Sequence, residues 1–379
     1  MLLKNAEVMD ESFALGKADI LLEGDRISAV GPNLPLTEEA LDLTGYTIFP
    51  GFVDIHIHGC GGFDTCDASR EALAGIASQL AQEGITSFCP TTMTISREGI
   101  EKTLGTIRAC MEQPPEGAAI LGVNMEGPYI ALGKKGGQKA ESVRKPDWQE
   151  FKHFYELSGG AIRIVDIAPE CEGADELIRH AKELCTVSIA HTESGYEEAS
   201  AAFQKGVSHV THLFNAMPGL GHREPGVVGA VFDNDRVTAE LICDGFHVHP
   251  AVLRMAFRLL GEDRSVVVSD SMRAAGLSDG TYDLGGQPVI VRDGKARLAD
   301  GTIAGSTTNL YQEVCNLIQF GIPLRQAVKA ATINPARVVG ADREIGSIEA
   351  GKRADLLILD AQRSLKAVIL RGKFVKNLL

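Results

Sequence analysis

The chain has 379 residues, a hydrophobic content of 44%, 41 glycines and a formal net charge of −13. A chain of this length can bury a large core, and a barrel of about 250 residues with additions would fit within it. The acidic balance, with no long basic run, argues against nucleic acid or an anionic membrane surface as the main partner.

The sequence favours a cytoplasmic protein. Residues 1–5 lack the charged segment and long apolar run of a secretion signal, and no apolar stretch approaches the ~20 residues that cross a bilayer. The eight cysteines are scattered without a CxxC pair. Cys89, Cys185 and Cys243 lie in apolar runs, which is typical of reduced and buried thiols.

Both ends of the chain are rich in short predicted strands. Apolar runs between turn sequences cover residues 1–8, 18–22 and 26–30 near one end, and 354–359, 367–370 and 373–375 near the other. We therefore predict a small β-sandwich domain built from residues 1–49 and 345–379. It would enclose a catalytic domain of residues 50–344.

The central region alternates predicted strands with predicted helices. The helical stretches include residues 71–82, 99–111, 174–183 and 251–260. Apolar strand candidates end at His58, Pro90, Glu126, Pro169, His191, His212, Asp244 and Asp270. Eight strand–helix units predict the α/β fold class and a (β/α)8 barrel. An open doubly wound sheet is the competing architecture, but residues 59–62 match its glycine-rich phosphate loop poorly.

Metal-ligand side chains gather where these strands end. His56 and His58 are two residues apart on the first strand, so both imidazoles point to one face. Glu126, His191 and His212 end the third, fifth and sixth strands, at the barrel face where such enzymes place their active sites. Five ligands are too many for one tetrahedral ion but suit two ions.

We predict that Glu126, His191 and His212 hold one ion. His56 and His58 would hold a second, with Glu126 or a hydroxide between the two. The expected cofactor is one or two divalent ions per subunit, with zinc or iron preferred to cobalt or manganese, all of which accept such ligands.

Other cysteines and histidines are weaker candidates for metal binding. Cys60 and Cys66 lie close to the histidine pair, but zinc sites that combine thiolates with His-x-His are uncommon among hydrolases. His153 and His180 lie in helical, charged surroundings. His209 lies three residues before the predicted ligand His212 and so faces the opposite side of the strand.

Two further residues are candidates for the chemistry itself. Asp270 follows an apolar strand, where a carboxylate beside the metal can accept a proton from water and deliver it to a leaving group. The alternative role for Asp270 is a helix N-cap. Residues 244–249 contain a second His-x-His, for which we expect His247 to polarise the substrate and His249 to begin the next helix.

These motifs together resemble the N-acetylglucosamine-6-phosphate deacetylases of the amidohydrolase superfamily, over nearly the whole chain. The segments that carry the resemblance are residues 50–62 (PGFVDIHIHGCGG), 125–129 (MEGPY), 190–192 (AHT), 211–217 (THLFNAM), 221–226 (GHREPG), 244–247 (DGFH), 269–270 (SD) and 303–306 (IAGS).

The resemblance implies a distorted barrel of the amidohydrolase type and a homodimer. Asp270 would be the acid/base and His247 would contact the acetyl carbonyl, while the retained His56 and His58 match members that bind two ions. Hydrolysis would convert N-acetylglucosamine 6-phosphate, a small amino-sugar phosphate, to glucosamine 6-phosphate and acetate. The implied substrate contacts are Gly137, Gln138, Asn215, Ala216, Arg223, His247, Ile303, Ala304 and Gly305.

Two positions depart from the family pattern. Gln138 stands where the family often has a substrate-binding histidine, and Ser271 replaces a common alanine. A related N-acyl sugar phosphate or N-acyl amine is therefore an alternative substrate. Other amidohydrolase activities, such as cyclic-imide hydrolysis, D-aminoacylase activity or deamination, are further alternatives, as is a non-enzymatic barrel scaffold.

Overall fold

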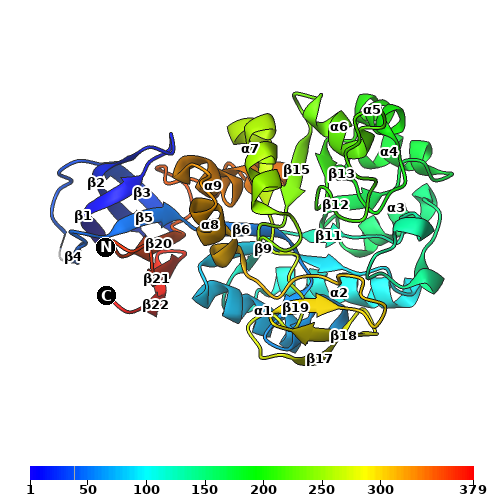
Figure 1. Cartoon of the computed structure of the whole chain (residues 1–379). Helices are drawn as coiled ribbons and strands as arrows, with labels where there is room; N and C mark the ends of the chain where they lie inside the picture. Colours follow the sequence, from blue (N-terminus) through cyan, green and yellow to red (C-terminus); the bar gives the residue numbers. More distant parts are fainter. Residues whose placement is uncertain (38) are drawn as a thin grey trace.

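The structure is a computed structural model that describes residues 1–37 and 39–379. It has two lobes, and Figure 1 shows both termini in the smaller one, beside a larger lobe of strands and helices. Among the described residues, no helix is both long and apolar enough to cross a membrane.

The smaller lobe is a sheet to which both ends of the chain contribute. Its strands are β1 (Leu2–Met9), β2 (Leu15–Glu23), β3 (Arg26–Gly31), β4 (Ala40–Asp42), β5 (Thr47–Pro50), β20 (Leu356–Leu359), β21 (Leu365–Leu370) and β22 (Lys373–Asn377). Their order is β22-β21-β20-β5-β1-β2-β3, with β4 beside β1. β5 runs antiparallel to β20, with Pro50 opposite Leu356. The predicted β-rich lobe is confirmed, while the domain boundaries at 49/50 and 344/345 stay predictions.

The larger lobe is a nearly closed barrel of eight parallel strands within the described chain. They are β6 (Phe52–Ile57), β9 (Ile85–Thr92), β11 (Val123–Met125), β12 (Ile162–Ile167), β13 (Thr186–Ile189), β14 (His209–Val210), β15 (Thr238–Leu241) and β16 (Ser265–Val267). The backbone N–H of Asp270, beyond β16, donates to the His56 carbonyl on β6 at 2.9 Å and links the first and last strands. The predicted (β/α)8 barrel is confirmed.

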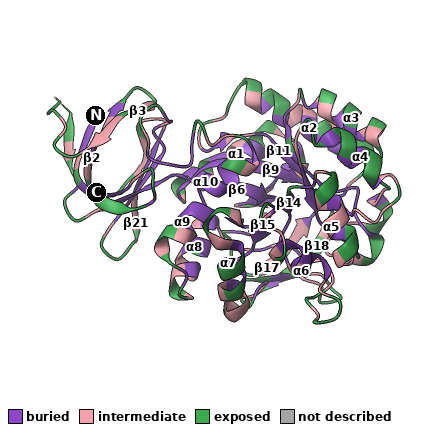
Figure 2. Cartoon of the chain, turned by 90° about the horizontal axis from the view of Figure 1, so that it is seen from above, coloured by how far each residue is buried: buried purple, intermediate pink, exposed green. Residues whose placement is uncertain are grey.

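Helices cover the outside of the barrel. They are α1 (Arg70–Gln82), α2 (Arg97–Glu112), α3 (Trp148–Leu157), α4 (Ala174–Ala181), α5 (Tyr196–Lys205), α6 (Gly226–Phe232), α7 (Pro250–Arg264), α8 (Leu310–Gln319), α9 (Leu324–Ala330) and α10 (Ile333–Val338), with short 3-10 turns η1 (Thr65–Asp67), η2 (Leu132–Lys134) and η3 (Ala140–Ser142). Figure 2 shows the barrel strands buried and the outer helix faces exposed. Every residue of β6 is buried, as expected for a strand covered on both sides. His249 is the N-cap of α7, as predicted.

Two features of the fold differ from the sequence-based expectation. The single strand expected to end at Glu126 is split into β10 (Ala119–Ile120) and β11, because Gly122 between them has a positive φ of 151°. Residues 280–297 form a sheet that the sequence reading missed, β17 (Gly280–Leu284), β18 (Gln287–Arg292) and β19 (Lys295–Arg297), drawn in yellow in Figure 1. The short strands β7 (Gly59–Cys60) and β8 (Phe63–Asp64) follow β6 and pair with each other in an antiparallel hairpin.

Candidate active site

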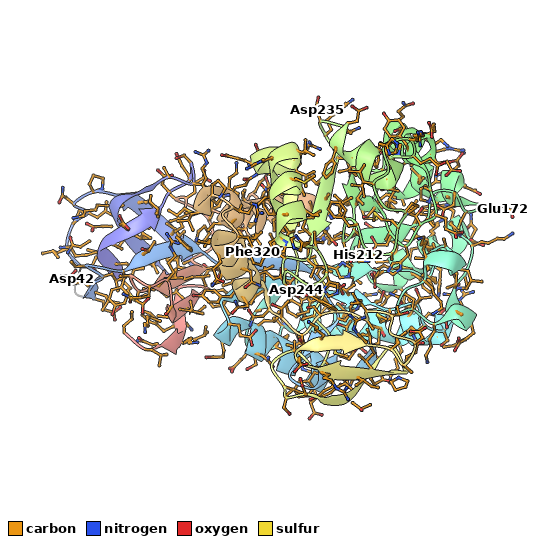
Figure 3. All side chains as sticks on the ribbon, viewed as in Figure 1. Asp42, Glu172, His212, Asp235, Asp244 and Phe320 are labelled. Atoms are coloured by element: carbon orange, nitrogen blue, oxygen red, sulfur yellow. The ribbon has the colours of Figure 1, made fainter. Side chains whose placement is uncertain are left out.

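The predicted site residues meet at one end of the barrel. His58 and Glu126 directly follow β6 and β11, while His191, His212 and Asp270 lie two or three residues beyond β13, β14 and β16. All five line one cavity of about 560 Å³. Figure 3 labels His212 within the barrel lobe, together with Asp244 from beyond β15.

Three of these residues turn the chain in an unusual way. His191, His212 and Asp270 have positive φ angles of 45°, 31° and 46°. A left-handed backbone costs a non-glycine residue on the order of 1–3 kcal/mol and is held only where surrounding contacts enforce it. Each of these turns ends a strand at the cavity, so the strain coincides with the point where a functional side chain enters the site.

Glu126 is the centre of the first group of candidate ligands. Its Oε1 atom lies 3.1 Å from Nε2 of His191 and 3.1 Å from Nε2 of His212. The two imidazole Nε2 atoms are 3.2 Å apart. Ligand atoms of these three buried residues all lie within 4.8 Å of one another, which is the spacing expected around one metal ion.

His56 and His58 form the second group with the same carboxylate. Nε2 of His58 lies 3.2 Å from Oε2 of Glu126, and Nε2 of His56 lies 3.5 Å from Oε1. The Oδ1 atom of Asp270 lies 3.3 Å from Nε2 of His58 and 3.6 Å from Nε2 of His56. Glu126 therefore faces both groups, whereas Asp270 faces the His56–His58 side.

Hydrogen bonds behind the imidazoles orient them for metal binding. Nδ1 of His191 lies 2.8 Å from the Lys134 carbonyl, and Nδ1 of His58 lies 3.3 Å from the Thr91 carbonyl. A carbonyl accepts only from a protonated Nδ1, so the lone pair of each ring is left on Nε2. The fully buried Nε2 of His56 has no hydrogen-bond partner among the residues that the structure describes. This donor set fits divalent metal ions such as zinc or iron.

The charges of the site favour a cation between the carboxylates. Burial raises the pKa of Glu126, but hydrogen bonds from His191, His212 and His58 hold that pKa well below its ordinary value. Burial lowers the pKa of His58, yet hydrogen bonds with Asp270 and Glu126 raise it to about 10. The carboxylates thus require positive charge at this point, which a divalent ion supplies in place of protons.

His247 approaches the cavity from beyond β15. Its Nδ1 lies 2.7 Å from Oδ2 of Asp244, and the other Asp244 oxygen accepts from the backbone N–H of Phe246 and of His247, both at 2.8 Å. Burial raises the pKa of Asp244, but the hydrogen bond from His247 and its charge keep that pKa below the ordinary value. Asp244 therefore stays anionic and orients the imidazole, whose ring lines the cavity.

Gln138 lies closer to the metal ligands than the sequence suggested. The residue is 2% exposed. Its amide nitrogen donates to Oε2 of Glu126 at 2.5 Å, and its amide oxygen accepts from the Thr94 backbone N–H at 2.7 Å. Its polar atoms are thus engaged by the protein as well as facing the cavity. Ser271, the other departure, donates to the Gly59 carbonyl at 2.9 Å.

The remaining predicted substrate contacts separate into two groups. Gly137, Asn215, Ala216, Ile303 and Gly305 line the cavity. Ala304 is buried against Gly137, with its Cβ 3.3 Å from where a Gly137 side chain would begin. Arg223 lies exposed on the segment before α6 and does not line the cavity of its own chain, as far as the described residues show.

The residues set aside from the metal site have other partners. His153 contacts Glu101 at 2.9 Å on the surface, and His180 stacks on Trp148. The Cys66 thiol accepts a hydrogen bond from the backbone of Met93, and Cys60 belongs to neither group of clustered ligands among the described residues. After Asp270 the described chain enters turns and the β17–β19 sheet rather than a helix, so the N-cap alternative is wrong.

The sequence reading missed one charged residue beneath the site. Glu240 lies within β15, is 0% exposed and contacts His56 and His209. A glutamate in the middle of the apolar run 237–243 was the available signal, because a buried carboxylate needs partners.

A family model described as the amidohydrolase family matches residues 47–375. The chain belongs to the amidohydrolase family. It is 37% identical to the N-acetylglucosamine-6-phosphate deacetylase of Bacillus subtilis, with 98% of this chain and 96% of that protein covered. It is 35% identical to the N-acetylgalactosamine-6-phosphate deacetylase of Escherichia coli O157:H7, with 92% of each covered.

A solved structure agrees over the full length. The N-acetyl-D-glucosamine-6-phosphate deacetylase of Mycobacterium smegmatis, a mutant in complex with N-acetyl-D-glucosamine 6-phosphate, gives a TM-score of 0.94 at 33% identity. The match covers 100% of this chain and 99% of that one. Family membership implies a divalent metal, and the two histidine–glutamate groups are the residues that fit it.

Replacing His191 with alanine should remove one bound ion per subunit, because it deletes one of three ligands of the first group. Metal content after dialysis, measured by mass spectrometry, checks this. His153→Ala is the matched control, since His153 is an exposed histidine whose imidazole contacts Glu101 far from either group of candidate ligands. An unchanged metal content in His191→Ala would contradict the assignment.

Proposed function

We propose that this protein hydrolyses N-acetylglucosamine 6-phosphate to glucosamine 6-phosphate and acetate. The observation that carries the proposal is that Glu126, His191 and His212 share one cavity with Asp270 and His247. This set supplies metal ligands, an acid/base and a carbonyl contact, the parts that metal-assisted amide hydrolysis needs. The activities of the relatives in Bacillus subtilis and Mycobacterium smegmatis support the choice of substrate.

The residues of the site divide the reaction between them. Glu126, His191 and His212 hold one divalent ion, and His56 and His58 with Glu126 hold a second. We favour zinc or iron, with cobalt or manganese as alternatives. A divalent ion supplies Lewis acidity here, which polarises a carbonyl and lowers the pKa of water.

Asp270 performs the proton transfers. It accepts a proton from the attacking water and then delivers that proton to the amine leaving group. His247 stabilises the developing negative charge on the acetyl oxygen. The contact of Nδ1 with Asp244 at 2.7 Å holds the His247 ring in place for this role.

The phosphate would be bound toward the outer part of the cavity. Lys134 and Lys135 line it and bring positive charge into an acidic protein. Gly137, Gln138, Asn215, Ala216 and the 303–305 segment are proposed sugar-phosphate contacts. Arg223 lies outside the cavity of its own chain. It can contact the phosphate only if its segment shifts or if it donates into the cavity of a second subunit, and we propose a homodimer as the assembly.

The cytoplasm is the proposed location. All eight cysteines are free thiols in the structure, and a reducing compartment keeps cysteines in that state.

N-acetylgalactosamine 6-phosphate is the second candidate substrate. The Escherichia coli relative that acts on this epimer is 35% identical to the chain, close to the 37% of the Bacillus subtilis relative. The ratio of kcat/KM for the two epimers distinguishes the candidates, and a ratio in favour of the galacto sugar would replace the first proposal.

Replacing Asp270 with asparagine should lower kcat by about 100- to 10,000-fold, since the amide cannot transfer the proton. Acetate release by metal-loaded protein is the measurement, with metal content determined in parallel. Asp300→Asn changes another carboxylate of the same cavity and should retain kcat within about tenfold. Near wild-type turnover by Asp270→Asn with full metal would refute the proposed role.

Replacing Arg223 with methionine should raise KM for the phosphorylated sugar roughly 10- to 100-fold, because the phosphate loses a charge-assisted hydrogen bond. KM for free N-acetylglucosamine should stay unchanged. Arg236→Met, on the exposed segment between α6 and β15, is the control for loss of a surface charge. Equal effects of Arg223→Met on both sugars would count against phosphate binding.

A further inference from the structure

A carboxylate lies beneath the candidate metal centre without being one of its proposed ligands. Glu240 is 0% exposed in the middle of β15, a position where burial of a charge is costly unless every oxygen is partnered. Neither the acid/base step nor the carbonyl contact uses it. Its partners therefore indicate what it does.

Both oxygens of Glu240 accept hydrogen bonds from the site or its support. Oε2 lies 2.9 Å from Nδ1 of His56 and accepts from the backbone N–H of His212 at 3.1 Å. Oε1 lies 3.2 Å from Nε2 of His209, whose Nδ1 lies 2.6 Å from the Thr238 hydroxyl. All three contacts are with nitrogen atoms that can donate a hydrogen bond, so the surroundings of Glu240 suit an ionised carboxylate.

We propose that Glu240 is the positioning residue that creates the second metal position, by fixing His56 as an Nε2 ligand and supplying the negative charge that a second cation needs. This inference rests on the two-ion part of the proposed function. It adds a specific determinant of whether the second ion binds.

The orientation of His56 supports the first half of the proposal. A carboxylate at 2.9 Å from Nδ1 holds a proton on that nitrogen, which leaves the lone pair on Nε2. That Nε2 faces Glu126 and Asp270 at 3.5 and 3.6 Å and has no hydrogen bond of its own. His58, in contrast, is backed only by the neutral Thr91 carbonyl at the longer distance of 3.3 Å.

The charge balance supports the second half. Two divalent ions bring four positive charges into a buried site, where Glu126 and Asp270 supply two negative charges. Glu240 supplies a third within hydrogen-bond distance of a ligand, and a carboxylate behind a metal-bound imidazole also raises the basicity of that ligand. Loss of Glu240 should therefore lower the affinity for the second ion more than the affinity for the first. Among the ligands of the first ion, Glu240 contacts His212, through its backbone N–H.

Two variants separate the two contributions. In Glu240→Gln, the amide oxygen must face His56 and the His212 N–H, so the acceptor remains and only the charge is lost. In Glu240→Leu, both the acceptor and the charge are lost, and three buried nitrogen donors, on His56, His209 and the His212 backbone, lose their partner. Asp166→Asn is the matched control, because Asp166 is an equally buried carboxyl on β12 whose partner is the Thr211 hydroxyl.

The test is a calorimetric titration of zinc into metal-stripped protein, with ions per subunit counted by mass spectrometry. We expect two ions for the wild type and Asp166→Asn, and an unchanged first ion with a 10- to 100-fold weaker second ion for Glu240→Gln. Glu240→Leu should hold one ion. If Glu240→Leu fails to fold, Glu240→Gln decides the question.

Two outcomes would overturn the proposal in different ways. Wild-type binding of both ions by Glu240→Gln, even with a lower unfolding temperature, would show a merely structural carboxylate and leave the proposed function intact. Only one ion in the wild type would overturn both this role and the two-ion centre. Neither result depends on acetate release, so a failure of the proposed substrate is seen separately.

Discussion

The structure depends on one electrostatic constraint: carboxylates and imidazoles from different strands must share a buried space. Glu126 alone lies within 3.5 Å of four histidine rings that come from three strands. Such a cluster is stable only if each charge is balanced and each ring is held in one orientation. The barrel satisfies this condition by ending the strands at a common face and by backing His191, His58 and His56 with hydrogen-bond acceptors.

The backbone conformation also helps to hold the site side chains in place. Left-handed turns at His191, His212 and Asp270 send three side chains into the cavity, and backbone hydrogen bonds hold two of these turns. The His212 N–H donates to Glu240 and the Asp270 N–H to the His56 carbonyl. The second of these bonds also joins the first and last strands, so barrel closure and active-site geometry are one structural feature.

Much of this was predictable from the sequence for a physical reason. His58, Glu126, His191, His212 and Asp270 each end an apolar run, and parallel strands bring their ends to one face. Local sequence does not report what lies behind a ligand, which is why Glu240 was missed. Gln138 was expected to contact substrate, yet its amide also holds Glu126, a contact set by the path of residues 127–137 and not by local pattern.

Other features could not be predicted because they depend on how distant segments are placed in the tertiary structure. The β17–β19 sheet has turn sequences at residues 285–286 and 293–294. These turns lie within the range that was assigned to the barrel domain, so they were not interpreted as a separate sheet. Arg223 shares a motif with the site residues, while its position outside the cavity depends on how the segment before α6 is placed. The motifs thus predicted which residues meet in the cavity, but they did not predict the residues that support them.

The most direct test of the account is acetate release from N-acetylglucosamine 6-phosphate by metal-stripped protein that is reloaded with zinc or iron. We predict no release above background from stripped protein, and recovery in proportion to the ions bound. Release by fully stripped protein, or no release by protein that has regained its ions, would contradict it.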